Sequence, residues 1–436
     1  MEKERIYFVI DMKSFFASVE CAERGLDAMT TDLIVADPSR CETTICLAVS
    51  PSLKAKGVKN RCRLYEVPKN LDYIIATPQM RKYIDYAAEI YAIYLKYIDK
   101  SDIHVYSIDE SFIDVTDYLK IYKLQPKQFA KMLMDEIHFK LGIPSTCGIG
   151  TNMYLAKIAL DITAKHSPDR IGFLDEKLFL STMWNHRPIT DFWGIASGIS
   201  ERLKRYGIHD MQGIATCSPD LLYREFGVNA ELMIDHSWGR ESCLMEDIKN
   251  YKGKTKSISN SQILAFNYSY RDAKIVLNEM IQEGCYRLAK EKCVTSHINL
   301  MIGYGDEQRT VSKASARTGV ETNLFSQIMP VAEHLFEDMV EKSIPIRRLA
   351  FSFGDLIPAK FQQQDLFTDF DKLAKERKLV DCILNIKDRF GKNAILKALD
   401  YEEKATQRER SCQIGGHRSG ENQNGSTKQG CTICSI

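Results

Sequence analysis

The sequence lacks the features that would take a chain into or across a membrane. Residues 1–16 begin with charged side chains, and their apolar run is too short for a signal peptide. No uninterrupted apolar stretch approaches the length that is needed to span a bilayer. The thirteen cysteines are scattered along the chain and do not show the spacing of a disulfide framework. These absences predict a cytoplasmic protein with reduced thiols and no membrane partner.

The chain also lacks a strong excess of either charge, since its formal net charge is +1. A value this small argues neither for nor against a nucleic-acid partner, so any basic surface must come from local clustering. The hydrophobic fraction of 44% and the charged fraction of 27% are those of a globular protein. A length of 436 residues predicts roughly two to four domains.

Hydrophobic periodicity predicts an α+β protein. The first 170 residues read as strand, helix, helix, hairpin, helix, strand and helix, an order that suits an antiparallel sheet with helices on one face. Residues 171–245 read as compact and helical, and residues 246–256 as a polar, basic linker. Residues 257–358 follow the order β-α-β-β-α-β, typical of a small α/β sandwich. From about residue 402 the chain is rich in Gly, Ser, Asn and Gln, which predicts disorder.

Two carboxylates occupy the turn of an otherwise apolar hairpin. The stretch HVYSIDESFIDVT, residues 104–116, places Asp109 and Glu110 side by side, where they repel each other unless a cation holds them. Asp11 follows the predicted strand RIYFVI and therefore also lies at a sheet edge. Alone, Asp11 would be a helix N-cap and the Asp-Glu pair a solvated turn. If the strand pairs with the hairpin, the three carboxylates meet and can hold two Mg²⁺ ions for phosphoryl transfer.

The segments FVIDMKSFFASVE and YSIDESFIDVT resemble the paired signatures of the Y-family, or translesion, DNA polymerases. The similarity continues in order through SLKAKGVKNRCRLYEV and CGIGTNMYLAKIALDITAKHSPDRIG, and it covers about residues 5–360. The branch that the chain most resembles is the UmuC-like one, the catalytic subunit of bacterial DNA polymerase V. The resemblance implies a right-hand fold with a palm (1–25 and 78–170), fingers (26–77), a helical thumb with a helix-hairpin-helix (171–245), a linker (246–256), a βαββαβ little finger (257–358), and a clamp-binding peptide with a disordered tail (359–436).

Residue roles follow from the same resemblance. It implies that Asp11, Asp109 and Glu110 bind the two Mg²⁺ ions, together with the backbone carbonyl of Met12. Phe16 falls on the steric gate that excludes a ribose 2′-hydroxyl. The further residues implied to bind the incoming deoxynucleoside triphosphate are Phe15, Lys54 and Lys165. Where many family members carry an aromatic residue before the fingers cation, this chain has Pro51, which offers no hydroxyl to the phosphates.

Contacts to primer-template DNA are expected in two places. GIASGI, with Gly194 and Gly198, precedes the cationic segment SERLKRYGI and reads as a helix-hairpin-helix whose small residues let the backbone approach a phosphate. In residues 257–358 the cations Lys313, Arg317 and Arg347 could line a phosphate-facing sheet. Tight helix packing is the simpler explanation of the glycines taken alone.

The C-terminal stretch carries a short docking motif. FQQQDLFTDF is similar to the pentapeptide by which bacterial polymerases bind the β sliding clamp, with Gln363, Asp365, Leu366 and Phe367 as its anchors. Further along, Cys412, His417, Cys431 and Cys434 could form a zinc site, but their Gly- and Asn-rich surroundings favour free thiols.

The sequence therefore predicts a low-fidelity, template-directed DNA polymerase that acts in DNA damage tolerance and the SOS response. No segment is assigned to a proofreading exonuclease, so none is expected. Accessory subunits or a recombinase filament are partners that the resemblance leaves open. Two alternatives compete with this interpretation: a catalytically weak, polymerase-like adaptor that acts through the sliding clamp, and a nucleotidyl cyclase, whose catalytic sheet uses similar carboxylates. The three retained carboxylates argue against the adaptor, and the basic fingers and the clamp-like peptide argue against the cyclase.

Overall fold

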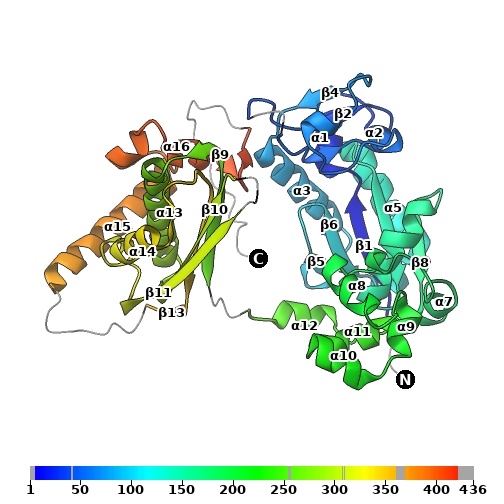
Figure 1. The fold of residues 1–436 in the computed structure, drawn as a ribbon. Helices are drawn as coiled ribbons and strands as arrows, with labels where there is room; N and C mark the ends of the chain where they lie inside the picture. Colours follow the sequence, from blue (N-terminus) through cyan, green and yellow to red (C-terminus); the bar gives the residue numbers. More distant parts are fainter. Residues whose placement is uncertain are drawn as a thin grey trace. The chain divides into compact units, whose positions relative to one another are not determined.

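The computed structural model describes residues 5–40, 43–253, 257–306, 308, 310–359 and 369–420. Contacts within the chain divide it into two units, Met1–Lys252 and Gly253–Ile436 (Figure 1). Among the residues so described, no helix combines the length and the apolar character that crossing a membrane requires.

A five-stranded sheet, here called the central sheet, organises the first unit. Its strand order is β5-β6-β1-β7-β8, and only the neighbours β7 and β8 are parallel. The strands are β1 (Tyr7–Met12), β5 (Ile103–Val105), β6 (Glu110–Asp114), β7 (Ser145–Gly150) and β8 (Ile171–Leu174). The α-helices associated with the sheet are α1 (Phe15–Ala22), α3 (Met80–Tyr94), α4 (Tyr118–Tyr122), α5 (Pro126–Leu141) and α6 (Met153–Ile158). In Figure 1 the strand β1 is drawn in blue within this group of elements.

Strand β1 is covered on both faces. Phe8, Ile10 and Met12 pack into a core that includes residues of α3 and α5. The alternate residues Tyr7 and Val9 pack on the opposite face with α6. The prediction of helices on one face only was therefore wrong. Because β1 is apolar in both rows and every residue of α6 is buried, the second face also needs a cover.

A second, three-stranded sheet lies between α1 and α3 in the sequence. Its order is β3-β2-β4, formed by β2 (Leu33–Val35), β3 (Ala48–Val49) and β4 (Ile74–Ala76). The short helix α2 (Pro51–Ala55) follows β3 directly. Ser50 is its N-cap, and the hydroxyl of Ser50 also accepts a hydrogen bond of 3.1 Å from the Leu33 amide of β2. Pro51 suits the first helical position because its missing N–H would have no partner there. This arrangement fixes the start of the helix that carries Lys54.

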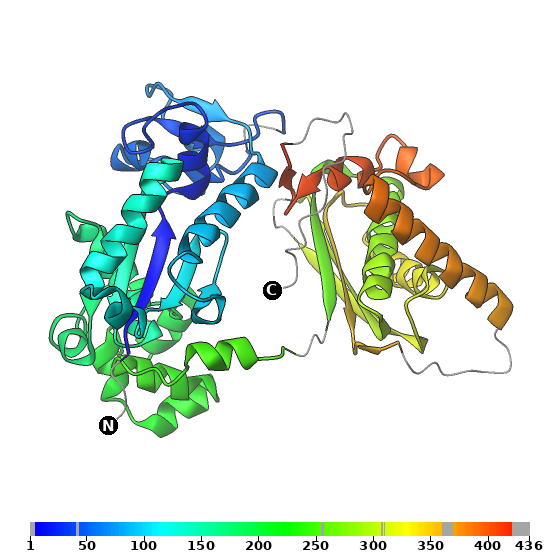
Figure 2. The ribbon, with the colours of Figure 1, turned by 180° about the vertical axis from the view of Figure 1, so that it is seen from behind.

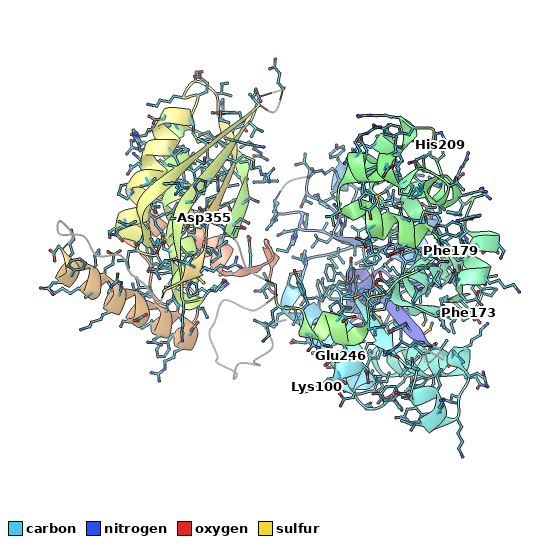
Figure 3. The ribbon with its side chains drawn as sticks, turned by 90° about the horizontal axis from the view of Figure 1, so that it is seen from below. Lys100, Phe173, Phe179, His209, Glu246 and Asp355 are labelled. Atoms are coloured by element: carbon cyan, nitrogen blue, oxygen red, sulfur yellow. The ribbon has the colours of Figure 1, made fainter. Side chains whose placement is uncertain are left out.

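Short helices form the rest of the first unit. They are α7 (Glu176–Thr182), α8 (Ser197–Lys204), α9 (Met211–Ala215), α10 (Pro219–Phe226), α11 (Asn229–Ser237) and α12 (Met245–Asn250). The 3₁₀ and π turns of the unit are η1 (Leu64–Glu66), η2 (Lys100–Asp102), η3 (Ala159–Thr163), η4 (Ala164–His166) and η5 (Ile189–Asp191). A separate apolar core, which contains Phe179 (Figure 3), holds α7 to α11 together.

Helix α12 occupies residues 246–250 of the predicted linker over residues 246–256. Met245 is buried against Tyr7, Val9 and Phe112 of the central sheet, and the Lys249 ammonium donates to the Ile103 carbonyl at 2.6 Å. The helix lies beside η2, as the labels of Glu246 and Lys100 in Figure 3 indicate. The polar composition of this segment reflects its solvent-facing side, whereas one buried methionine anchors it.

The second unit contains a five-stranded sheet, here called the C-terminal sheet. Four strands follow the order β11-β10-β12-β9, β13 pairs with β10 off this path, and all neighbours are antiparallel. The elements are β9 (Ile258–Tyr268), α13 (Tyr270–Lys290), β10 (Cys293–Tyr304), β11 (Val311–Thr322), α14 (Phe325–Met339), β12 (Ile346–Gly354) and β13 (Ile357–Pro358). The predicted order β-α-β-β-α-β is confirmed. Helices α13 and α14 cover one face of the sheet (Figures 1 and 2).

Residues 369–420 are folded, which corrects the prediction of a disordered tail. They form α15 (Phe370–Phe390), η6 (Ala398–Tyr401), α16 (Gln407–Ser411), β14 (Gln413–Ile414) and β15 (His417–Arg418). Glu279 of α13 is buried and accepts hydrogen bonds from the amide of Thr406, its hydroxyl and the amide of Gln407, at 2.9, 2.9 and 3.0 Å. Helix α15 contacts α13, beside which it is drawn in orange in Figure 2. A buried carboxylate thus anchors a segment whose own composition is polar.

Candidate active site

The predicted carboxylates meet at one end of the central sheet. Asp11 of β1 and Glu110 of β6 are direct partners in the antiparallel register, so their side chains project from the same face. Asp109 precedes Glu110, and its carbonyl accepts a hydrogen bond of 2.9 Å from the Met12 amide. The Ser107 hydroxyl donates to Asp109 Oδ1 at 2.6 Å. The hairpin therefore presents Asp109 and Glu110 beside the last residues of β1.

A buried lysine that the sequence analysis did not select faces these carboxylates. The Lys157 Nζ of α6 lies 2.8 Å from Glu110 Oε1 and 2.9 Å from Oε2, and 3.2 Å from Asp161 Oδ2. Lys157 is 7% exposed. A lysine in the middle of a helix usually extends into solvent, so Lys157 was not selected from the sequence. The spacing of four residues between Lys157 and Asp161 is the one available signal.

The concentration of negative charge perturbs the acids. Burial, together with the charges of Asp109 and Glu110, raises the pKa of Asp11 to about 7, although Lys157 acts in the opposite direction. Burial also raises the pKa of Glu110, which Lys157 partly offsets. A perturbed carboxyl group in a cluster of acids is typical of a functional site, because folding alone gains nothing from the repulsion.

The acid cluster fits a hard divalent cation. Glu110 Oε1 is buried and, among the described residues, has no well-directed hydrogen bond, although the Lys157 ammonium lies close to it. Oxygen ligands from one or two carboxylates are the usual set for Mg²⁺. In the side-chain positions described here, no three His, Cys, Asp or Glu side chains already form a closed ligand set. A cation would therefore compete with Lys157 for Glu110.

Basic residues surround the same end of the sheet. The Lys54 ammonium donates to the Ser14 hydroxyl at 2.8 Å, and Lys54 interacts electrostatically with Asp11, Lys13 and Lys165. Lys13 follows β1 directly. Burial lowers the pKa of the Lys13 ammonium, and the charges of Arg170 and Lys165 lower it further, whereas Asp11 raises it.

Of these cations, the sequence analysis found Lys54 and Lys165 but missed Lys13 and Arg170. The Lys13 amide donates to the Pro144 carbonyl, and the Arg170 carbonyl accepts from the Cys147 amide of β7. Both residues therefore flank strand ends at the same sheet edge, which no local sequence pattern reveals.

The two phenylalanines at the start of α1 have different surroundings. Phe15 is buried in the main core, whereas Phe16 is partly exposed. The ring of Phe16 stacks on Tyr83 of α3, with centroids 4.5 Å apart and planes at 17°. Ser14 adopts a left-handed conformation with φ of 47° and does not cap α1 with its side chain. The first amides of α1 are thus available to an anion.

Comparisons with known proteins agree with this geometry. Residues 10–161 match the model of the impB/mucB/samB family, and residues 255–366 match the model of the C-terminal domain of that family. The chain is 30% identical to the putative UV-damage repair protein UvrX of Bacillus subtilis (strain 168), over 94% of this chain and 97% of that protein. It is also 30% identical to DNA polymerase IV 2 of the same organism, over 96% of this chain and 100% of the relative.

A solved structure has the same fold. The Y-family DNA polymerase chimera Dbh-Dpo4(243-245)-Dbh aligns with a TM-score of 0.61 and 19% identity, over 81% of this chain and 99% of that chain. The chain belongs to the Y family of DNA polymerases. The predicted family and fold class are confirmed. The two relatives from Bacillus subtilis match at equal identity, so the UmuC-like branch stays a prediction for this Y-family polymerase.

The glycines expected to approach DNA lie at the start of α8 in this Y-family polymerase. Gly194 has φ of 91°, a conformation that favours glycine. Gly198 is exposed, and a Cβ atom there would meet nothing within 4 Å. The packing of α8 therefore does not require glycine at position 198. Ala196, the N-cap of α8, provides no side-chain hydrogen bond, so the first amides of the helix remain available.

The face of the C-terminal sheet that points away from α13 and α14 carries no carboxylate over its central rows. The strand register gives three such rows, each named here in the strand order β11, β10, β12 and β9. The first row is Lys313, Met301, Ala350 and Ser261, and the second is Ser315, Asn299, Ser352 and Ser259. The third row is Arg317, His297 and Gly354, from β11, β10 and β12. Arg348 is exposed and pairs with Gly303 beyond them, whereas the predicted Arg347 lies in the bulge beside it. This face is polar, small in side-chain size and basic at the β11 edge.

Two predicted sites lie outside the described residues. The clamp-binding anchors Gln363, Asp365, Leu366 and Phe367 fall within residues 360–368. Cys431 and Cys434 of the candidate zinc site fall within residues 421–436. Both assignments remain predictions.

Proposed function

We propose that this Y-family polymerase extends a DNA primer by nucleotidyl transfer at the end of the central sheet, with Asp11, Asp109 and Glu110 as its catalytic acids. The register that pairs Asp11 with Glu110 beside the hairpin of Asp109 carries the proposal. Three acids with basic side chains around them suit attack of the primer 3′-hydroxyl on the α-phosphate of a nucleoside triphosphate, with pyrophosphate as the leaving group.

The residues divide the chemistry between them. Asp11, Asp109 and Glu110, with the Met12 carbonyl, would hold two Mg²⁺ ions. When bound, these ions neutralise phosphate charge and increase the acidity of the primer 3′-hydroxyl. Lys157 holds Glu110 in place through its paired contacts and limits the repulsion among the acids when no cation is bound.

The incoming deoxynucleoside triphosphate is positioned by cations and amides. Lys54, Lys165, Lys13 and Arg170 would surround the phosphates, and the uncapped start of α1 would donate amides to them. Pro51 offers no hydroxyl to the phosphates, and the positive charges of Lys13 and Arg170 would compensate for this missing contact. The partly exposed ring of Phe16 would lie under the sugar and exclude a 2′-hydroxyl.

Contacts to primer-template DNA would be independent of sequence, as a polymerase requires. The start of α8, with Gly194 and Gly198, and the central rows of the C-terminal sheet, with Lys313 and Arg317, suit phosphate contacts. Arg348 extends that face and would act together with Arg347. The same reasoning supports lesion bypass, because neither surface reads bases.

Primer extension tests the catalytic assignment. Asp109→Ala should abolish extension with Mg²⁺ and retain binding of primer-template DNA, measured by fluorescence anisotropy. Asp135→Ala, which removes an exposed carboxylate of α5, is the control and should extend normally. Extension by Asp109→Ala at the wild-type rate would refute the assignment, whereas a wild-type protein that binds DNA without extending it would favour the adaptor function.

The relatives support a role in DNA damage tolerance, since one is named a putative UV-damage repair protein. We assign Gln363 to Phe367 to the β sliding clamp on the sequence motif alone. Stimulation of extension by purified clamp on lesion-bearing templates would test both roles together.

A further inference from the structure

A buried carboxylate on α1 holds the partly exposed ring of Phe16 through Tyr83. Glu20 is 0% exposed, lies one helical turn after Phe16, and accepts a hydrogen bond of 2.7 Å from the Tyr83 hydroxyl. Tyr83 is also 0% exposed and stacks on the Phe16 ring at 4.5 Å. Tyr83 of α3 therefore links two side chains of α1, the Phe16 ring and the Glu20 carboxylate.

Two further side chains fix Glu20 itself. The side-chain amide of Gln79, the residue just before α3, donates to Oε1 and Oε2 of Glu20 at 3.1 and 3.3 Å. Arg24, one turn further along, forms a short ion pair with Oε2 and also donates to the Glu20 carbonyl at 2.6 Å. A carboxylate without exposure is costly to a fold unless each partner is satisfied. Apolar side chains would hold two helices together at lower cost, so the charge at position 20 needs another reason.

We propose that Glu20 is a positioning residue for sugar selection: through the Tyr83 hydroxyl it fixes the plane of the Phe16 ring. This inference rests on the proposed role of Phe16 as the gate. A ring excludes one hydroxyl group only if it cannot yield by a fraction of an ångström, and a rotamer held by packing alone yields more easily than one braced by a hydrogen-bonded partner. Tyr83 supplies the packing, and Glu20 prevents the tyrosine ring from moving.

A matched link between the same helices provides the control. The Tyr86 hydroxyl donates to Glu23 Oε1 at 2.9 Å, one turn further along both α1 and α3. The Glu23 side chain is 32% exposed, and Tyr86 is not among the rings that stack on Phe16. Tyr86→Phe removes a tyrosine–glutamate hydrogen bond from the α1–α3 contact without touching the gate.

The test is the ratio of kcat/KM for a deoxynucleotide to that for the matching ribonucleotide. Tyr83→Phe keeps the stacked ring but loses the hydroxyl, and we expect the ratio to fall by about tenfold, mainly through better use of the ribonucleotide. Glu20→Ala should lower the ratio further, and Glu20→Gln, which retains an oxygen acceptor for Tyr83, should restore part of it. Tyr86→Phe should leave the ratio at the wild-type value.

The outcomes separate this inference from the gate assignment. If Phe16→Ala admits ribonucleotides but Tyr83→Phe retains the wild-type ratio, the gate stands and the positioning role of Glu20 is refuted. If Phe16→Ala leaves the ratio unchanged, both assignments fall. A loss of activity toward both sugars in equal proportion in Tyr83→Phe would show a purely structural role and would also refute the inference. Because Tyr83→Phe changes one atom, the test does not depend on whether Glu20→Ala folds.

Discussion

Replacing Asp11 with Asn should stabilise the cation-free protein while it removes catalysis. Asp11 has a pKa of about 7 in the folded chain, compared with an ordinary value of 3.8. Between these values the folded state binds more protons than the unfolded state, so the free energy of unfolding falls as the pH rises. The Asp11 contribution to this loss is about 2 kcal/mol at pH 5 and about 4 kcal/mol at pH 8.

The comparison between the two pH values isolates the electrostatic effect. Any packing change caused by asparagine is the same at pH 5 and pH 8 and cancels. The stabilisation of Asp11→Asn relative to wild type should therefore be larger at pH 8 by about 2.5 kcal/mol. Saturating Mg²⁺ at pH 8 should reduce this advantage, because the ion binds the wild-type acids more tightly than those of the variant.

Urea unfolding followed by tryptophan fluorescence provides the measurement. The three tryptophans, Trp184, Trp193 and Trp238, all lie in the first unit, so their emission follows that unit within the full chain. A difference between variant and wild type that is equal at pH 5 and pH 8 would refute the reasoning. Destabilisation of Asp11→Asn at pH 8 in the absence of Mg²⁺ would refute it as well.

Three further predictions concern the triphosphate, the C-terminal segment and the clamp. Lys13→Met and Arg170→Met should each raise the KM for a deoxynucleoside triphosphate by about fivefold, which is the effect of losing about 1 kcal/mol of charge interaction. Lys82→Met, which removes an ion pair with Glu23, is the control and should leave the KM unchanged. Equal KM values for all of these variants and the wild type would exclude Lys13 and Arg170 from the site. Glu279→Ala should expose the stretch between α15 and α16 to limited proteolysis, because the amides of Thr406 and Gln407 lose their acceptor. Glu291→Ala, at the end of the same helix, removes a pair with Arg287 and is the control; identical digestion of all three proteins would contradict the anchoring role. Deleting Gln363 to Phe367 should abolish stimulation by the β sliding clamp and spare unstimulated synthesis; persistent stimulation would place the clamp contact elsewhere.

The sequence predicted the parts of the site that depend on strand ends. An apolar strand that stops at Asp11 and a hairpin that turns at Asp109 and Glu110 can be recognised locally, and pairing of the two brings the acids together. The order of elements in residues 257–358 could be predicted for the same reason, since each strand and helix there has a clear period.

The parts that were missed depend on contacts between distant segments. Lys157 reads as a solvated helix residue until the sheet is placed beneath it, and Tyr83 is one of several aromatic residues on a long helix. The folding of residues 369–420 depends on partners far away in the sequence, such as Glu279 for Thr406 and Ser326 for Glu376. Local composition contains no information about such a partner, so the polar segment was predicted to be disordered.

The alternation along β1 has a consequence for how this enzyme can vary. The odd-numbered residues Tyr7, Val9 and Asp11 form one row, which ends at the proposed catalytic acid, and the even-numbered residues from Phe8 to Met12 fill the main core. Point substitutions affect one row at a time. An insertion or deletion of a single residue within the strand would instead move every following side chain to the opposite face of the sheet. Asp11 would then point into the main core, and Met12 would take a place on the face that Asp11 occupies now. Natural variation in this strand should therefore exchange apolar side chains of similar size within each row, keep Asp11, and preserve the length of the strand.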